Sequence, residues 1–68
     1  MKTLFTVDGA KLTTARIEAG MSMEDVAAKI GWNKSSLSRW ERGIVHPSER
    51  AIVKLAMLLN RGDFIKER

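Results

Sequence analysis

Apolar residues recur at intervals of three and four in several short stretches of the chain, the spacing of one face of an α-helix. The first stretch runs from about Gly9 to Ala19 and places Leu12, Ala15 and Ala19 on the same face. Asp8 stands directly before it, where an aspartate can accept a hydrogen bond from the first free backbone N–H groups. The pattern therefore predicts a first helix with an N-cap.

A second helix is predicted from Ser22 to about Ile30. The residues from Ser22 to Asp25 have the pattern of a capping box, in which serine accepts from a backbone amide and the acidic residue reaches back to the cap. Val26, Ala27 and Ile30 would form the inward face. The small Ala27 would allow another helix to approach closely.

A third helix is predicted between Asn33, a good N-cap, and Gly43. Leu37 and Trp40 give it a narrow apolar stripe, and its other positions are polar. The segment from Gly31 to Asn33 breaks the helical pattern, so helices two and three would be joined by a short turn.

The strongest periodicity belongs to a fourth helix capped by Ser48, whose apolar positions are Ile52, Leu55, Ala56 and Leu59. Single glycines follow the helical stretches, where a left-handed C-cap is favoured; they are Gly20, Gly31, Gly43 and Gly62. Residues 62–65 predict one further short helical turn, and residues 66–68 are expected to fray. The sequence thus predicts an all-α fold, a compact bundle of four to five short helices in one domain over residues 1–68.

Composition excludes several function classes. The chain has no cysteine and a single histidine, His46, so disulfides and thiolate or histidine metal sites are excluded. We expect no enzyme activity, cofactor or small-molecule ligand, because there is no phosphate-binding glycine loop and no carboxylate pair with an obvious cleft. No apolar run reaches the roughly 20 residues of a membrane span, and no signal peptide is recognisable, which predicts a cytoplasmic protein. A net charge of +4 favours polyanionic partners.

Helices two and three, joined by a glycine-containing turn over residues 22–43, have the arrangement of a helix-turn-helix. The chain resembles the phage Cro and repressor helix-turn-helix family over roughly residues 9–60. The resemblance is carried by Arg16, Gly20-Met21-Ser22, Val26-Ala27, Ile30-Gly31, Leu37-Ser38-Arg39-Trp40-Glu41-Arg42-Gly43, Pro47 and Leu55-Ala56-x-x-Leu59. It implies a protein that binds double-stranded DNA by placing helix three in the major groove.

The resemblance also implies which side chains meet the bases, namely Lys34, Ser35, Ser38 and Arg39. Arg39 can donate two hydrogen bonds to guanine O6 and N7, Lys34 can donate to the same acceptors, and serine hydroxyls are unselective. The alternative is that these residues form an ordinary solvated helix face.

Phosphate contacts are expected at both ends of the motif, from Ser22, Asn33, Ser36, Arg42, Gly43 and His46, since backbone amides and positive charge suit anionic oxygens. His46 also has a second interpretation as a neutral loop residue. The family often has glutamine at the position of Met23, and methionine cannot donate to a phosphate, which weakens that contact here.

Two further predictions concern structure. The resemblance implies an ion pair between Arg16 in helix one and Glu41 at the end of helix three, which would fix the angle of the recognition helix. Trp40 is interpreted as core packing. Trp32 in the turn allows two interpretations, covering the core beside Ile30 or lying exposed against DNA.

A domain this small contacts too little DNA for tight recognition, so we expect a homodimer, weak in the absence of DNA, on a pseudo-palindromic operator. Candidate interface residues are Ile44, Val45, Phe64 and Ile65, although all four could instead close the core of the monomer. The expected function is repression by occupying an operator. A restriction-modification controller or an antitoxin-type interaction module that autoregulates through DNA has the same architecture and remains an alternative.

Overall fold

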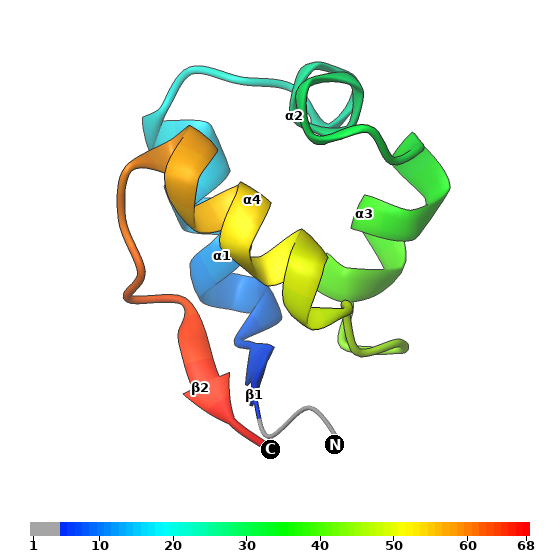
Figure 1. Ribbon diagram of the computed structural model, residues 1–68. Coiled ribbons are helices and arrows are strands. Elements are labelled where there is room, and N and C mark those ends of the chain that lie inside the picture. Colours follow the sequence, from blue (N-terminus) through cyan, green and yellow to red (C-terminus); the bar gives the residue numbers. More distant parts are fainter. Residues whose placement is uncertain (1–4) are drawn as a thin grey trace.

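Four helices and a small sheet make up the computed structural model, which describes residues 5–68 (Figure 1). In chain order the elements are β1 (Phe5–Val7), α1 (Gly9–Glu18), α2 (Met23–Ile30), α3 (Lys34–Glu41), α4 (Glu49–Leu59) and β2 (Ile65–Glu67). The all-α class and the four predicted helices are confirmed, and α2 and α3 form the helix-turn-helix.

Each helix begins at a polar residue predicted to cap it. The side chains of Asp8, Ser22, Asn33 and Ser48 each accept a hydrogen bond from the backbone N–H three residues further on. These bonds satisfy donors that have no partner within the helix, which explains why the four starting points were visible in the sequence.

The helix ends follow the prediction less closely. Gly31 ends α2 in the left-handed conformation, with φ of 82°. The prediction was wrong at Gly62, because Asn60 adopts the left-handed conformation that ends α4, with φ of 55°. Asparagine tolerates this conformation better than most residues, so the helix stops two residues before the glycine. Ala19, predicted on the apolar face of α1, is its exposed C-cap.

The last residues form a strand, so the predictions of a fifth helical turn over residues 62–65 and of fraying at 66–68 were wrong. β2 pairs antiparallel with β1, with Phe5 opposite Glu67 and Val7 opposite Ile65. The backbone N–H of Asp8 continues the contact by donating to the carbonyl of Phe64 at 2.7 Å. Two segments from opposite ends of the chain satisfy each other's backbone groups, and local periodicity cannot reveal such a pairing.

The core lies between the helices and the sheet. It is built from buried residues of every element except β2, together with Phe64 just before it: Val7, Leu12, Ala15, Val26, Ile30, Leu37, Trp40, Ala51, Ile52, Leu55, Leu59 and Phe64. Ala27 is also buried. Within residues 5–68 no helix has both the length and the apolar character needed to cross a membrane.

Candidate nucleic-acid interface

The recognition helix α3 is anchored by its apolar stripe and presents its other side to solvent. Leu37 and Trp40 are buried in the core. Asn33 begins the helix by accepting from the N–H of Ser36 at 2.8 Å. The buried stripe fixes the rotation of α3 about its own axis, and the cap fixes where the helix begins. The outward face of α3 therefore keeps a defined orientation relative to the rest of the domain.

That outward face gathers the predicted base-contacting residues around a single open surface cavity of about 270 Å³, lined by Lys34, Ser35, Ser38, Arg39 and Arg42. Ser38 is half-buried and the other four are exposed. No carboxylate of residues 5–68 forms an ion pair with Lys34, Arg39 or Arg42. Three cations on one face therefore keep their full donor capacity for an external anion or base edge.

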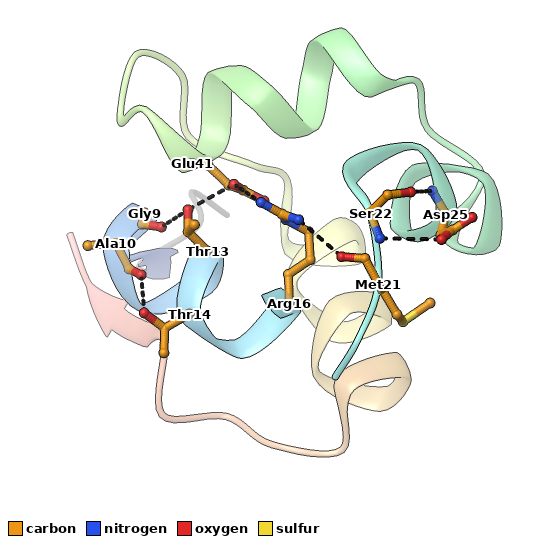
Figure 2. Close-up of polar contacts among 9 residues, drawn as sticks. All are labelled: Gly9, Ala10, Thr13, Thr14, Arg16, Met21, Ser22, Asp25 and Glu41. Atoms are coloured by element: carbon orange, nitrogen blue, oxygen red, sulfur yellow. Dashed lines mark hydrogen bonds and ion pairs between the residues drawn. The ribbon is translucent and has the colours of Figure 1, made fainter. Parts of the chain in front are cut away.

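The C-terminal end of α3 is held by the predicted ion pair, which is present. Arg16 Nε lies 2.8 Å from Glu41 Oε2, and Arg16 Nη2 donates to Glu41 Oε1 at 3.3 Å (Figure 2). Thr13 donates its hydroxyl to the same Oε1 at 2.8 Å, and Arg16 Nη1 donates to the carbonyl of Met21 at 3.0 Å. The side chains of Arg16 and Glu41 are only 12% and 4% exposed. The guanidinium thereby connects α1, the loop before α2, and α3.

Gly9 is a second contact point that the sequence analysis did not recognise. A β-carbon at Gly9 would overlap the backbone carbonyl of Glu41 and press on that of Trp40. The first turn of α1 thus touches the last turn of α3 backbone to backbone. The available signal was a glycine at the start of a helix, where a better helix former would otherwise be expected.

At the start of α2 the capping box is formed, with consequences for phosphate binding. Asp25 N donates to Ser22 Oγ at 3.0 Å, and Ser22 N donates to the Asp25 carboxylate at 3.3 Å (Figure 2). The backbone N–H of Ser22 is therefore occupied, and only its hydroxyl proton remains as a donor. Met23 packs against the core, and Glu24 adds a second carboxylate to this turn. This helix end is less suited to a phosphate than the resemblance implies.

The other predicted phosphate ligands keep different amounts of donor capacity. Asn33 uses its side-chain oxygen as a cap and retains its NH₂ group. Gly43 donates its N–H to the Trp40 carbonyl at 3.2 Å. His46 Nδ1 lies 2.7 Å from the hydroxyl of buried Thr6, so it anchors the loop before α4 to β1 and keeps only Nε2 for a ligand. Ser36 is half-buried, and Arg42 belongs to the α3 cavity.

Trp32 covers the core, the first of its two interpretations. It is half-buried and packs edge-on against Trp40, with ring centroids 6.0 Å apart. The ammonium of Lys54 lies 5.9 Å from the centroid of the Trp32 ring. The turn between α2 and α3 is therefore fixed to α4 as well as to the core.

The four predicted interface residues are not equivalent. Phe64 is fully buried, so its assignment to a dimer interface was wrong and it closes the core of the monomer. Ile65 is half-buried against the core. Ile44 and Val45 are 62% and 46% exposed and remain candidates. Sequence reasoning missed Phe5, which alternates with Thr6 in β1 and is exposed.

Similarity to known proteins agrees with this geometry. A helix-turn-helix family model matches residues 12–63. No curated protein matches the chain. Among solved structures, the restriction-modification controller protein C.AhdI from Aeromonas hydrophila is 34% identical with a TM-score of 0.74, over 78% of this chain and 77% of that one. The phage P22 c2 repressor bound to a synthetic operator is 19% identical with a TM-score of 0.75, over 78% and 80%, a likeness of fold alone.

The biofilm regulator SinR is similar as well. Its N-terminal DNA-binding domain from Bacillus subtilis is 34% identical with a TM-score of 0.71, over 76% of this chain and 77% of that domain. In the SinR–SinI complex the match spans 52% of the other chain, about half its length. Because the family model covers more than half of the sequence, this chain belongs to the Cro/C1-type helix-turn-helix family of DNA-binding transcriptional regulators.

Proposed function

We propose that this regulator recognises a specific operator sequence in double-stranded DNA through the outward face of α3 and represses transcription by occupying it, as Cro-like proteins do. The supporting observation is the α3 cavity, where three cations that form no ion pair within residues 5–68 surround two serine hydroxyls. The width of the major groove admits one α-helix, and this is the polar face such a helix would present to base edges.

Within this proposal the polar side chains have two roles, contact with base edges and contact with phosphates. Arg39 donates both arms of its guanidinium to a guanine, and Lys34 donates to a second acceptor nearby. Arg42, the NH₂ of Asn33 and the hydroxyls of Ser22 and Ser36 contact phosphates, which orient the protein without selecting sequence. Each half-site should contain at least one guanine.

The regulator is proposed to bind as a homodimer to two half-sites about 34 Å apart, related by a two-fold axis. One domain of this size buries too little DNA surface for tight recognition, and pairing doubles the contacts. The P22 c2 repressor, which has the same fold, was solved with operator DNA, and SinR, 33% identical to this chain, was solved in complex with DNA. Promoter overlap would then exclude polymerase without any enzymatic step.

A second candidate is an interaction module, of the antitoxin type, whose main task is to cover a protein partner. It is favoured by the exposed apolar pair Ile44 and Val45 and by the SinR–SinI complex among the similar structures. This candidate predicts that Arg39→Ala leaves function intact, whereas Ile44→Glu abolishes it.

The decisive experiment is selection of bound sequences from a random duplex library at fixed salt concentration. We expect an enriched palindrome that contains guanines. Arg39→Ala should weaken binding to that site by about 1–3 kcal/mol and relax preference at one base pair, whereas Arg42→Ala should weaken binding to all duplexes alike and lower the salt slope by about one. Arg50→Ala, which removes an exposed arginine from α4, is the matched control. No enrichment, or identical behaviour of Arg39→Ala and Arg50→Ala, would contradict the proposal.

A further inference from the structure

The two-stranded sheet lies outside the part of the chain that matches the family. The family match covers residues 12–63, whereas β1 and β2 occupy residues 5–7 and 65–67. In Figure 1 the two strands lie side by side at the end of the molecule where both chain termini emerge. The sheet therefore lies beyond the helical unit that the family model matches.

An apolar cleft opens where this sheet meets α4. It has a volume of about 280 Å³ and is lined by Phe5, Glu49, Ile52, Val53 and Ile65. Phe5 and Val53 are 44% and 52% exposed although both are large and apolar. Covering such side chains releases about 25 cal/mol for each Å² of apolar surface removed from water, so this face gains from an apolar partner.

A carboxylate and a guanidinium both lie beside the cleft. Glu49 lines the cleft, while Arg68 reaches Phe5 and donates its Nε to the Phe5 carbonyl at 3.3 Å. Neither side chain forms an ion pair within the described part of the chain. In a two-fold interface, a contact from one residue of the first copy to another residue of the second copy is repeated in the opposite direction. One carboxylate and one guanidinium per copy can therefore form two intermolecular pairs.

Strand addition at the edge of the sheet is a poorer solution. β2 carries exposed Lys66 and Glu67, and a short edge strand with charged side chains disfavours pairing with another chain. Lys66 lies on the face opposite to Phe5, whereas Glu67 is the cross-strand partner of Phe5 and shares its face, so the face beside α4 carries this carboxylate next to its apolar residues.

We propose that a second copy of this chain docks on the face formed by Phe5, Val53 and Ile65, with Phe5 of each copy entering the cleft of the other and Glu49 pairing with Arg68 across the two-fold axis. This inference rests on the proposed function, because operator binding as proposed requires a dimer. It assigns the dimer interface to the sheet instead of to Phe64. The Thr6–His46 hydrogen bond ties the loop that carries Ile44 and Val45 to the side of β1 opposite to Phe5, and neither residue lines the cleft.

The test compares Val53→Glu with Ile17→Glu, which places the same charge on an exposed isoleucine of α1 outside the cleft. Titrations use the full chain with the selected palindrome and with a single half-site, and thermal melting checks that both variants are folded. We expect Val53→Glu to lose cooperative binding to the palindrome by about tenfold or more while its half-site affinity is kept. Ile17→Glu should behave as the unsubstituted protein.

A charge exchange keeps the test decisive if Val53→Glu does not fold. Glu49→Arg or Arg68→Glu alone should weaken cooperativity, and the double variant should restore it. Equal cooperativity in all variants, or loss only on Ile44→Glu, would overturn the assignment of this face while leaving sequence recognition intact. A chain that shows no preference for any duplex would instead overturn the proposed function, and that outcome is visible before cooperativity is measured.

Discussion

The C-terminal end of α3 and the outward face of the same helix differ in how their polar groups are used. At the end of the helix, the Glu41 carboxylate accepts from Arg16 and Thr13 and is almost completely buried. On the outward face, Lys34 and Arg39 are exposed and form no ion pair within residues 5–68. Changes at the first region should therefore alter stability, and changes at the second should alter binding.

The largest effect is expected for Glu41→Ala. The Arg16 guanidinium would stay buried without its carboxylate, and removing one partner of a buried pair costs about 3–5 kcal/mol. That loss is a large part of the stability of a domain this small. Urea denaturation followed by circular dichroism measures the free energy of unfolding.

Replacement of both partners provides the control. In the double variant Arg16→Met with Glu41→Leu no charge remains buried, and such replacements are often neutral or stabilising. If the double variant is as unstable as Glu41→Ala, the loss of stability comes from losing the ion pair itself. It would then not come from leaving the Arg16 guanidinium buried and unpaired.

A smaller loss is expected for Gly9→Ala. The added methyl group would overlap the carbonyl of Glu41, so α1 or the end of α3 must shift. Overpacking of this kind costs about 1–3 kcal/mol. Gly62→Ala is the matched control, because its methyl group would make only an ordinary contact with Ile65. Equal melting temperatures for the two variants would contradict the close approach of α1 to α3.

Lys34→Ala tests the other half of the comparison. A single ammonium donates less selectively than a guanidinium, so the loss of operator affinity should be near 1 kcal/mol, at the low end for a base contact. The free energy of unfolding should change by no more than about 0.5 kcal/mol, since the side chain is exposed. A fluorescence anisotropy titration and a urea melt of the same variant measure both quantities, and a loss of stability without loss of affinity would reverse the assignment.

The sequence predicted those features that depend on local chemistry. Ser22 with Asp25 and Asn33 with Ser36 are capping contacts three residues apart, and both were predictable because capping requires only neighbouring residues. The outward polar face of α3 followed from two apolar positions, Leu37 and Trp40. The pairing of Arg16 with Glu41, 25 residues apart, was reached only through resemblance to a family.

The sequence did not predict features that depend on distant segments meeting. β1 and β2 pair across almost the whole length of the chain, and a three-residue strand has too few positions to show a period of two. Phe64 appeared free for a dimer because its buried environment is formed by other elements. Gly9 shows the same limit, since the reason for a glycine lies in the Glu41 backbone, 32 positions away.

The smallest effect is expected at a second ion-pair cluster, which joins the end of α1 to the segment after α4 and is the exposed counterpart of Arg16 and Glu41. Arg61 lies 2.6 Å from Glu18 and 2.7 Å from Asp63, and the carboxylates are more than half exposed. The hydrogen bond from Arg61 lowers the pKa of Asp63 below its ordinary value. The ionised Asp63 carboxylate therefore contributes to stability near neutral pH, and this contribution is lost as the pH falls through the lowered pKa of Asp63 in the folded state.

Asp63→Asn should thus melt slightly below the unsubstituted protein at pH 7, and the difference should vanish in strong acid, where the native carboxylate is protonated as well. Salt should also shrink it, because solvent and ions screen exposed charges. Glu67→Gln, an exposed carboxylate without an ion pair in residues 5–68, is the control and should show neither dependence. A difference at Asp63 that persists in acid and at high salt would mean that the substitution destabilises the fold by something other than loss of the carboxylate charge.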